Sequence, residues 1–362
     1  MILQIKPHID KNDIKTVSRY MATTWVSEGP ACRDFEKAFK KFTGAKYCAN
    51  MCNGTLALFA ALKALNIGPG DEVIVPSYTF AATINAVILA QATPVVVDVD
   101  YETGGINPEE INKNITNKTR AVIPVHLYGL AAEIEEIMKL AKTHGLFVVE
   151  DAAEAVGVRI NGKHAGTFGD FGIFSFYGNK TITTGEGGMI TSNKKSLNQK
   201  VFQLKNHGRT KKGTFVHQDI GYNFSLSDLQ AALGVSQMQK INKLISAKIN
   251  IYKQYRANLA SSKSVKFSRI GKKVEPAHWL TNILVDNAEY LNKKLAKEKI
   301  QTRLAFFPIK RQPCYNKFKN IKFSKNLKND DRLFKSLLSL PSYVGLSEKQ
   351  IQMISQKIKQ NI

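Results

Sequence analysis

Short apolar runs alternate with helical segments from about residue 45 to residue 240, and few folds accommodate this alternation. Segments with helical periodicity, such as 55–65, 79–90 and 132–144, separate the apolar runs. The pattern predicts an α/β fold with a mostly parallel, seven-stranded sheet that is covered by helices on both faces. Ligands of such sheets bind at the carboxyl ends of the strands. The expected strands are 47–51, 72–76, 93–99, 121–126, 146–150, 171–176 and 188–191.

A lysine-rich helical stretch at about 227–260 follows the last expected strand and is expected to lead the chain into a second domain. We therefore expect a large, ligand-binding domain at 31–245 and a smaller C-terminal α/β domain at 246–362. Residues 1–30 are expected to pack beside the small domain. A chain of 362 residues is long enough to bury two cores.

Composition makes several classes of protein improbable. The most apolar stretch, 81–99, is interrupted by polar residues, and the first residues are too polar for a signal peptide. We therefore expect a cytoplasmic protein that does not associate with a membrane. The cysteines have no metal-site spacing and are expected to be reduced thiols, so no metal is predicted. They are Cys32, Cys48, Cys52 and Cys314.

The net charge of +23 requires an explanation. The lysines are spread along the chain, without a block of like charges or a nucleic-acid-binding motif, so no nucleic-acid partner is predicted. Two interpretations of the charge stay open. It reflects a lysine-rich surface, or it provides a positive field that attracts phosphate-bearing substrates.

Three segments have the residue types of a cofactor site. Asp151 directly follows the expected strand 146–150, where a carboxylate can pair with a protonated pyridine nitrogen or simply cap a helix. Lys180 lies in a Gly- and Thr-rich loop after strand 171–176, where a lysine can form a Schiff base with an aldehyde, although an isolated lysine is usually a surface amine. Ser175 can donate to a phosphate. The Asn-Gly-Thr segment at 53–55 begins a helix, where backbone N–H groups bind phosphate or form a plain cap.

The phosphate anchor, the ring-nitrogen acid and the lysine occur in a chain order that resembles the DegT/DnrJ/EryC1/StrS family of sugar aminotransferases. These are fold-type I enzymes dependent on pyridoxal 5'-phosphate (PLP). The resemblance runs through nearly the whole chain, and the loop 178–188 is most similar to that of the perosamine synthase group. The other shared landmarks are 25–27 (Trp-Val-Ser), 71–76 (Asp-Glu-Val-Ile-Val-Pro), 150–155 (Glu-Asp-Ala-Ala-Glu-Ala), 221–223 (Gly-Tyr-Asn) and the Pro-x-Tyr at 313–315.

The resemblance implies a role for each matching residue. Lys180 would carry the cofactor and move the proton, with pyridoxamine 5'-phosphate as the intermediate form. Asp151 would pair with the pyridine nitrogen, and Glu154 would lie near the ring hydroxyl. Phe80 would stack on the ring. Asn223 would reach the phosphate of a neighbouring subunit, which implies a homodimer with shared active sites. The remaining phosphate ligands would be Gly54, Thr55 and Ser175.

The residue at position 180 also bears on the reaction. Family members that dehydrate a sugar carry His there, and imidazole cannot form the Schiff base, so lysine favours transamination.

Other positions depart from the family pattern. The segment 307–312 lacks the His expected of perosamine synthases. Lys310 and Arg311 form an anion clamp or are solvated surface cations. His207 and Arg209, in a loop that the family places near the site, contact substrate or lie on the surface.

Three functions follow, and the first is preferred. It is transfer of an amino group, with L-glutamate as the expected donor, to a phosphorylated carbohydrate. The expected ketone is a nucleotide-linked 4-keto-6-deoxy sugar for surface polysaccharide. The second is amination of a small phosphorylated ketone such as dihydroxyacetone phosphate, giving serinol phosphate. The third is a non-catalytic regulatory or binding protein on the same fold.

Overall fold

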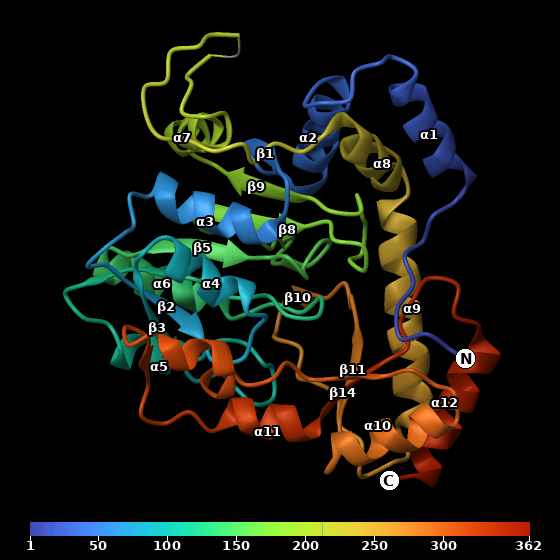
Figure 1. Cartoon of the computed structure of the whole chain (residues 1–362). Helices are drawn as coiled ribbons and strands as arrows, with labels where there is room; N and C mark the ends of the chain where they lie inside the picture. Colours follow the sequence, from blue (N-terminus) through green and yellow to red (C-terminus); the bar gives the residue numbers. More distant parts are fainter. Residues whose placement is uncertain (212) are drawn as a thin grey trace.

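A computed structural model describes residues 1–211 and 213–362, and its centre is an eight-stranded sheet in the order β1-β9-β8-β5-β4-β2-β3-β13 (Figure 1). All seven expected strands are present. The expected count of seven is one short, because β13 from the C-terminal part pairs with β3 in parallel. The strands are β1 (Tyr47–Met51), β2 (Glu72–Pro76), β3 (Thr93–Val97), β4 (Thr119–Val122), β5 (Phe147–Asp151), β8 (Phe171–Ser175), β9 (Gly188–Ser192) and β13 (Lys322–Phe323).

The sheet is parallel except for β9, which runs antiparallel to both of its neighbours, β1 and β8. Most strand residues are buried, as expected for a sheet covered on both faces. One apolar cluster joins one face to α2 (Pro30–Thr43), α6 (Ile134–His144) and α8 (Asp228–Gln239). A second cluster joins the opposite face to α3 (Gly54–Ala64), α4 (Ala82–Leu89) and α7 (Lys195–Lys205). The expected α/β architecture is therefore confirmed.

Helix α9 (Ile241–Leu259) leads the chain away from the large sheet (Figure 1). The expected helical stretch at 227–260 is divided at Lys240 into α8 and α9. A smaller antiparallel sheet follows, in the order β11-β14-β12, and packs with α9, α10 (Ala288–Lys297) and α12 (Glu348–Gln360) around a separate core. Its strands are β11 (Thr281–Leu284), β12 (Arg303–Leu304) and β14 (Leu337–Leu340).

Several segments connect the two sheets. A three-stranded sheet pairs β10 (Val274–Glu275), from beyond α9, with β6 (Arg159–Ile160), which also pairs with β7 (Lys163–His164). The N-terminal segment contacts both parts, because Ile2 bridges to Ile300 while α1 (Lys11–Met21) packs on α8. The remaining helices are α5 (Pro108–Lys113), α11 (Asn329–Ser336) and the 3₁₀ turns η1 (Ile309–Arg311) and η2 (Pro313–Lys317).

Within residues 1–211 and 213–362, no helix has the length and apolar character needed to cross a membrane. No group of three or more metal-ligating side chains occurs in the same ranges.

Candidate active site

A cavity of about 380 Å³ opens at the carboxyl ends of β5 and β8, between the large sheet and the small domain. Its volume is near the lower limit for ligand pockets, which span roughly 300–1,000 Å³. The large domain contributes the acid, lysine and helix-start segments singled out in the sequence. The small domain contributes three further side chains, which are Trp279, Arg303 and Phe306.

Asp151 ends β5 with its carboxylate in the cavity wall, and its side chain is almost fully buried. Thr83 donates a 2.8 Å hydrogen bond from Oγ1 to Asp151 Oδ2, and the Ala153 N–H donates to Oδ1 at 3.2 Å. Burial raises the pKa of Asp151, while the Thr83 and Ala153 bonds and the nearby charge of Lys180 oppose the rise. A cationic ring nitrogen beside the carboxylate would likewise offset the free-energy cost of burying its ionised form.

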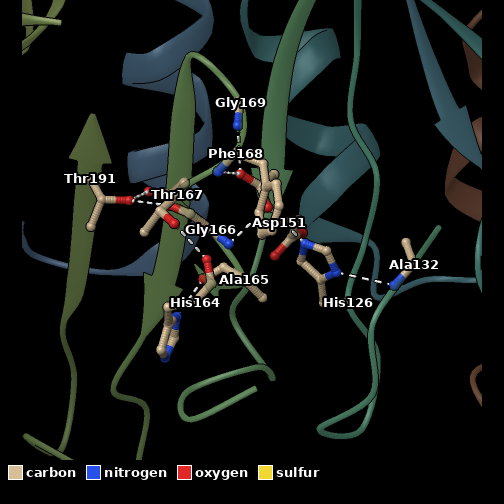
Figure 2. Close-up of polar contacts among 12 residues, drawn as sticks. His126, Ala132, Asp151, His164, Ala165, Gly166, Thr167, Phe168, Gly169 and Thr191 are labelled. Atoms are coloured by element: carbon tan, nitrogen blue, oxygen red, sulfur yellow. Dashed lines mark hydrogen bonds and ion pairs between the residues drawn. The ribbon is translucent and has the colours of Figure 1, made fainter. Parts of the chain in front are cut away.

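The backbone of Asp151 is held in place by a buried network on its other side (Figure 2). The N–H of His126 donates to the Asp151 carbonyl at 3.0 Å. The His126 ring contacts the carboxylate of Glu150 at 3.1 Å, and the N–H groups of Gly166, Phe168 and Gly169 donate to that carboxylate at 2.6–2.8 Å. The two acids thus have separate tasks, since Glu150 fixes a loop while Asp151 faces the cavity.

Lys180 extends toward the same cavity from the loop after β8. Its Nζ is 3.2 Å from Glu154 Oε1 and 4.2 Å from the ring centroid of Trp279. The N–H of Tyr128 donates to Glu154 Oε2 at 2.9 Å, which fixes the acid that holds the lysine. Burial raises the pKa of Glu154, and the positive charge of Lys180 opposes that rise.

The start of α3 forms part of the cavity wall. The side chain of Asn53 caps the helix by accepting from the Leu56 N–H at 2.9 Å, and Gly54 and Thr55 line the cavity next to Ser175. A Cβ on Gly54 would lie 3.2 Å from the Ser175 Cβ, so glycine allows close packing here. Free N–H groups at a helix start, beside a hydroxyl, suit a phosphate.

Not every expected site residue lies at the cavity. Phe80 lines it, with its ring centroid 5.9 Å from that of Phe306. Asn223 is exposed and does not line it. His207 and Arg209 are also outside, in the loop after α7, where Arg209 donates to the Asn206 side chain at 2.7 Å.

The expected anion clamp at 310–311 does not line the cavity either. Arg311 forms a 3.0 Å ion pair with Asp331 and lies over the ring of Phe307 at 4.9 Å. Lys310 is exposed on η1. A guanidinium already paired with a carboxylate is poorly suited to bind a second anion.

Other residues of the site were not predicted from the sequence. Thr83 had a usable signal, because Thr79 and Thr83 are four residues apart in a helical segment whose one other polar side chain is that of Asn85. Trp279, Arg303 and Phe306 had none, since no local pattern relates them to Lys180.

The family model that describes the DegT/DnrJ/EryC1/StrS aminotransferases matches residues 7–359 of the chain. The chain belongs to this family. It is 38% identical over 359 residues to a GDP-perosamine synthase of Escherichia coli O157:H7, covering 98% of this chain and 97% of that protein. It is 36% identical over 365 residues to the GDP-perosamine synthase of Vibrio cholerae, covering 99% and 98%.

Solved structures agree with the family assignment. The structure of S. venezuelae DesV has a TM-score of 0.91 at 29% identity and covers 96% of this chain and 93% of its own. An aminotransferase from Psychrobacter cryohalolentis has a TM-score of 0.93 at 29% identity, with coverage of 98% and 97%. The chain is therefore a PLP-dependent sugar aminotransferase on the expected fold, and the non-catalytic alternative is not supported.

The residues of the cavity fit this cofactor and divide its chemistry. When bound, PLP supplies an aldehyde for a lysine amine and a ring that accepts electron density. Asp151 is positioned to hold a positive charge at the ring nitrogen, and the start of α3 with Ser175 suits the phosphate. Lys180 Nζ can take a proton from one substrate carbon and return it elsewhere, with Glu154 stabilising its charged form.

Proposed function

We propose that the chain transfers the amino group of L-glutamate to the ketone of a nucleotide-linked 4-keto-6-deoxy sugar used for surface polysaccharide. The observation that carries the proposal is a lysine, Lys180, within hydrogen-bonding distance of Glu154 in a cavity that also holds Asp151. The similarity to GDP-perosamine synthases over 95% or more of both chains supports a nucleotide-linked substrate.

The charge of the chain supports the same substrate class. A net charge of +23 attracts polyanions, and a nucleoside diphosphate sugar carries two phosphates. The modest cavity suits the cofactor and the reacting part of the sugar, so the nucleotide would bind beyond it.

A substrate assay tests the proposal. The purified, PLP-loaded protein is given L-glutamate with either a GDP-linked 4-keto-6-deoxyhexose or dihydroxyacetone phosphate, and the aminated product is detected by mass spectrometry. Amination of the sugar with release of 2-oxoglutarate is expected. Turnover with dihydroxyacetone phosphate alone would overturn the sugar-nucleotide assignment and favour an amino-alcohol phosphate as product.

The proposed active form is a cytoplasmic homodimer with shared active sites. Three exposed apolar side chains in the loop after α7 support an interface there: Phe215, Val216 and Ile220 are 88%, 69% and 79% exposed. Figure 1 shows this loop projecting from the body of the molecule. Asn223 follows on the same segment and is exposed, which leaves it available to a second subunit. The four free cysteines suit a reducing compartment.

A further inference from the structure

The charged side chains that line the cavity differ in whether they already have a charged partner. Among the residues described, the lining contains two cations, Lys180 and Arg303, and three acids, Asp151, Glu154 and Glu186. Lys180 is paired with Glu154 and is committed to the cofactor. Arg303 forms no ion pair and no side-chain hydrogen bond with any residue in 1–211 or 213–362. It is the cation of the lining that is left for an anionic ligand.

Arg303 approaches the cavity from the small domain. It lies on the short edge strand β12, opposite Ser339 of β14, and its side chain lines the cavity together with Phe306. Arg303 is exposed toward the cavity mouth, and the cavity that it lines is the one that Lys180 and Glu154 also line. The guanidinium therefore borders the cavity that contains the reactive lysine.

The chemistry of the two half-reactions decides which anion it meets. In an amino-acid donor, the α-carboxylate is bonded directly to the carbon that reacts at the cofactor. In a nucleotide sugar, the phosphates lie across the sugar ring from the ketone. A cavity of about 380 Å³, shared with the cofactor, must hold the first group but not the second. A guanidinium binds a carboxylate with two parallel hydrogen bonds.

We propose that Arg303 binds the α-carboxylate of the amino donor. This assignment rests on the proposed aminotransferase function, and it separates donor recognition from recognition of the sugar nucleotide. Arg303 would also orient the donor, because two hydrogen bonds fix the direction of the bond between the carboxylate and the reacting carbon.

Single-turnover kinetics test the proposal one half-reaction at a time. Conversion of the PLP form by L-glutamate is followed by loss of the cofactor's absorbance, and the reverse change follows addition of the keto sugar to the pyridoxamine form. Arg303→Gln is expected to raise the apparent dissociation constant for glutamate about 10- to 100-fold, as expected for loss of charge-assisted hydrogen bonds. The sugar half-reaction is expected to change less than about threefold. The dissociation constant of Arg303→Lys should lie between those of wild type and Arg303→Gln, because lysine keeps the positive charge but cannot form two parallel hydrogen bonds to a carboxylate.

Two further measurements isolate the carboxylate. 4-Aminobutyrate lacks the α-carboxylate, so its reaction with the PLP form should be the same in wild type and Arg303→Gln. Calorimetry of L-glutamate binding to PLP-loaded Lys180→Ala protein, with and without Arg303→Gln, measures affinity without turnover. Arg120→Gln is the matched control, since Arg120 is exposed on β4 and outside the cavity.

Three outcomes would overturn the assignment. Unchanged glutamate kinetics and affinity would make Arg303 a surface cation. A loss confined to the keto-sugar half-reaction would assign it to the phosphates. Equal losses in both, with a lower melting temperature, would make it structural. Failure of the wild-type protein to react with any amino acid would instead refute the proposed function. The absorbance change of the wild-type protein alone therefore distinguishes this result from a failure of the Arg303 assignment.

Discussion

The indole ring of Trp279 lies under the amine of Lys180, with 4.2 Å between Nζ and the ring centroid. The same indole donates from Nε1 to the carbonyl of Asn179 at 2.8 Å. A residue of the small domain thus holds both the backbone before the lysine and the lysine's charged end. Lys248, which is buried on α9, donates to the carbonyl of Trp279 at 3.0 Å and to that of Ser342 at 2.6 Å. The position of the reactive amine therefore depends on how the two domains pack.

Trp279→Phe is expected to loosen this arrangement. Phenylalanine keeps an aromatic face for the ammonium but cannot donate to the half-buried Asn179 carbonyl, and the loss of such a hydrogen bond costs about 0.5–1.5 kcal/mol. We expect kcat to fall about 3- to 10-fold and the melting temperature to fall by a few degrees. Steady-state kinetics and thermal unfolding measure both. Tyr290→Phe, at an exposed position on α10, is the control and should change neither.

Lys180→Ala is expected to abolish multiple turnover while leaving the fold intact. Removal of both the cofactor attachment and the proton-transfer group should lower kcat by at least about 10³-fold. The circular dichroism spectrum should be unchanged, and PLP should become removable by dialysis. Lys194→Ala, which removes an exposed lysine paired with Asp170, should retain wild-type rates. Multiple turnover by Lys180→Ala would refute the mechanism.

Asp151→Asn and Thr83→Val test the residue that is expected to pair with the ring nitrogen. The first substitution removes its charge, and the second removes one hydrogen bond to it. The amide cannot offset a positive charge on the ring, so Asp151→Asn should lower kcat severely, by about 10²-fold or more. Thr83→Val removes one hydrogen bond to the carboxylate and should lower kcat or PLP affinity by only about tenfold. Both are measured by kinetics and by titration with PLP. Equal effects of the two substitutions would show that Thr83, not the charge of Asp151, controls the site.

Two buried histidines predict a loss of stability in acid. Burial lowers the pKa of His164 and of His278 to about 4 from an ordinary value of 6.5. His164 cannot be charged in place, because its Nε2 accepts from the Gly157 N–H at 2.8 Å. The unfolded chain therefore binds more protons between pH 6.5 and about 4, so stability should be lost as pH falls through that range.

Urea unfolding measured at several pH values between 4 and 7 tests this linkage. The slope of stability against pH should decrease in His164→Asn and in His278→Phe relative to wild type. An unchanged slope in both variants would assign the acid sensitivity to other groups.

Mixing of inactive variants tests the shared active site. If the active form is the proposed homodimer with shared sites, Asn223→Ala and Lys180→Ala would each impair every site of their own homodimer. In a mixed dimer with shared sites, one site has both wild-type residues, so unfolding and refolding the two variants together should restore activity. The expected recovery is about a quarter of the wild-type rate if subunits pair at random. No recovery would indicate that Asn223 does not act across an interface, and gel filtration reports the oligomeric state independently.

Much of the fold was predictable because its signals are local. Seven of the eight strands of the large sheet are short apolar runs beside helical segments, so each of the seven could be predicted from its own residues. The eighth strand, Lys322–Phe323, has only two residues and no apolar pattern. It exists because the C-terminal part of the chain returns to pair with β3, and that is a property of packing rather than of local sequence.

The sequence by itself determined which groups could do chemistry: Asp151 at the end of a strand, Lys180 in the loop after another, and Gly54 at a helix start. The carboxyl ends of parallel strands lie at the same edge of the sheet, and this does not depend on the sequence of the loops. Only the tertiary structure placed Trp279 beneath Lys180, left Arg303 at the cavity without an ion-pair partner among the described residues, and paired Arg311 with Asp331. Those contacts join residues far apart in the chain, so they depend on how the small domain packs against the sheet, which local periodicity does not encode.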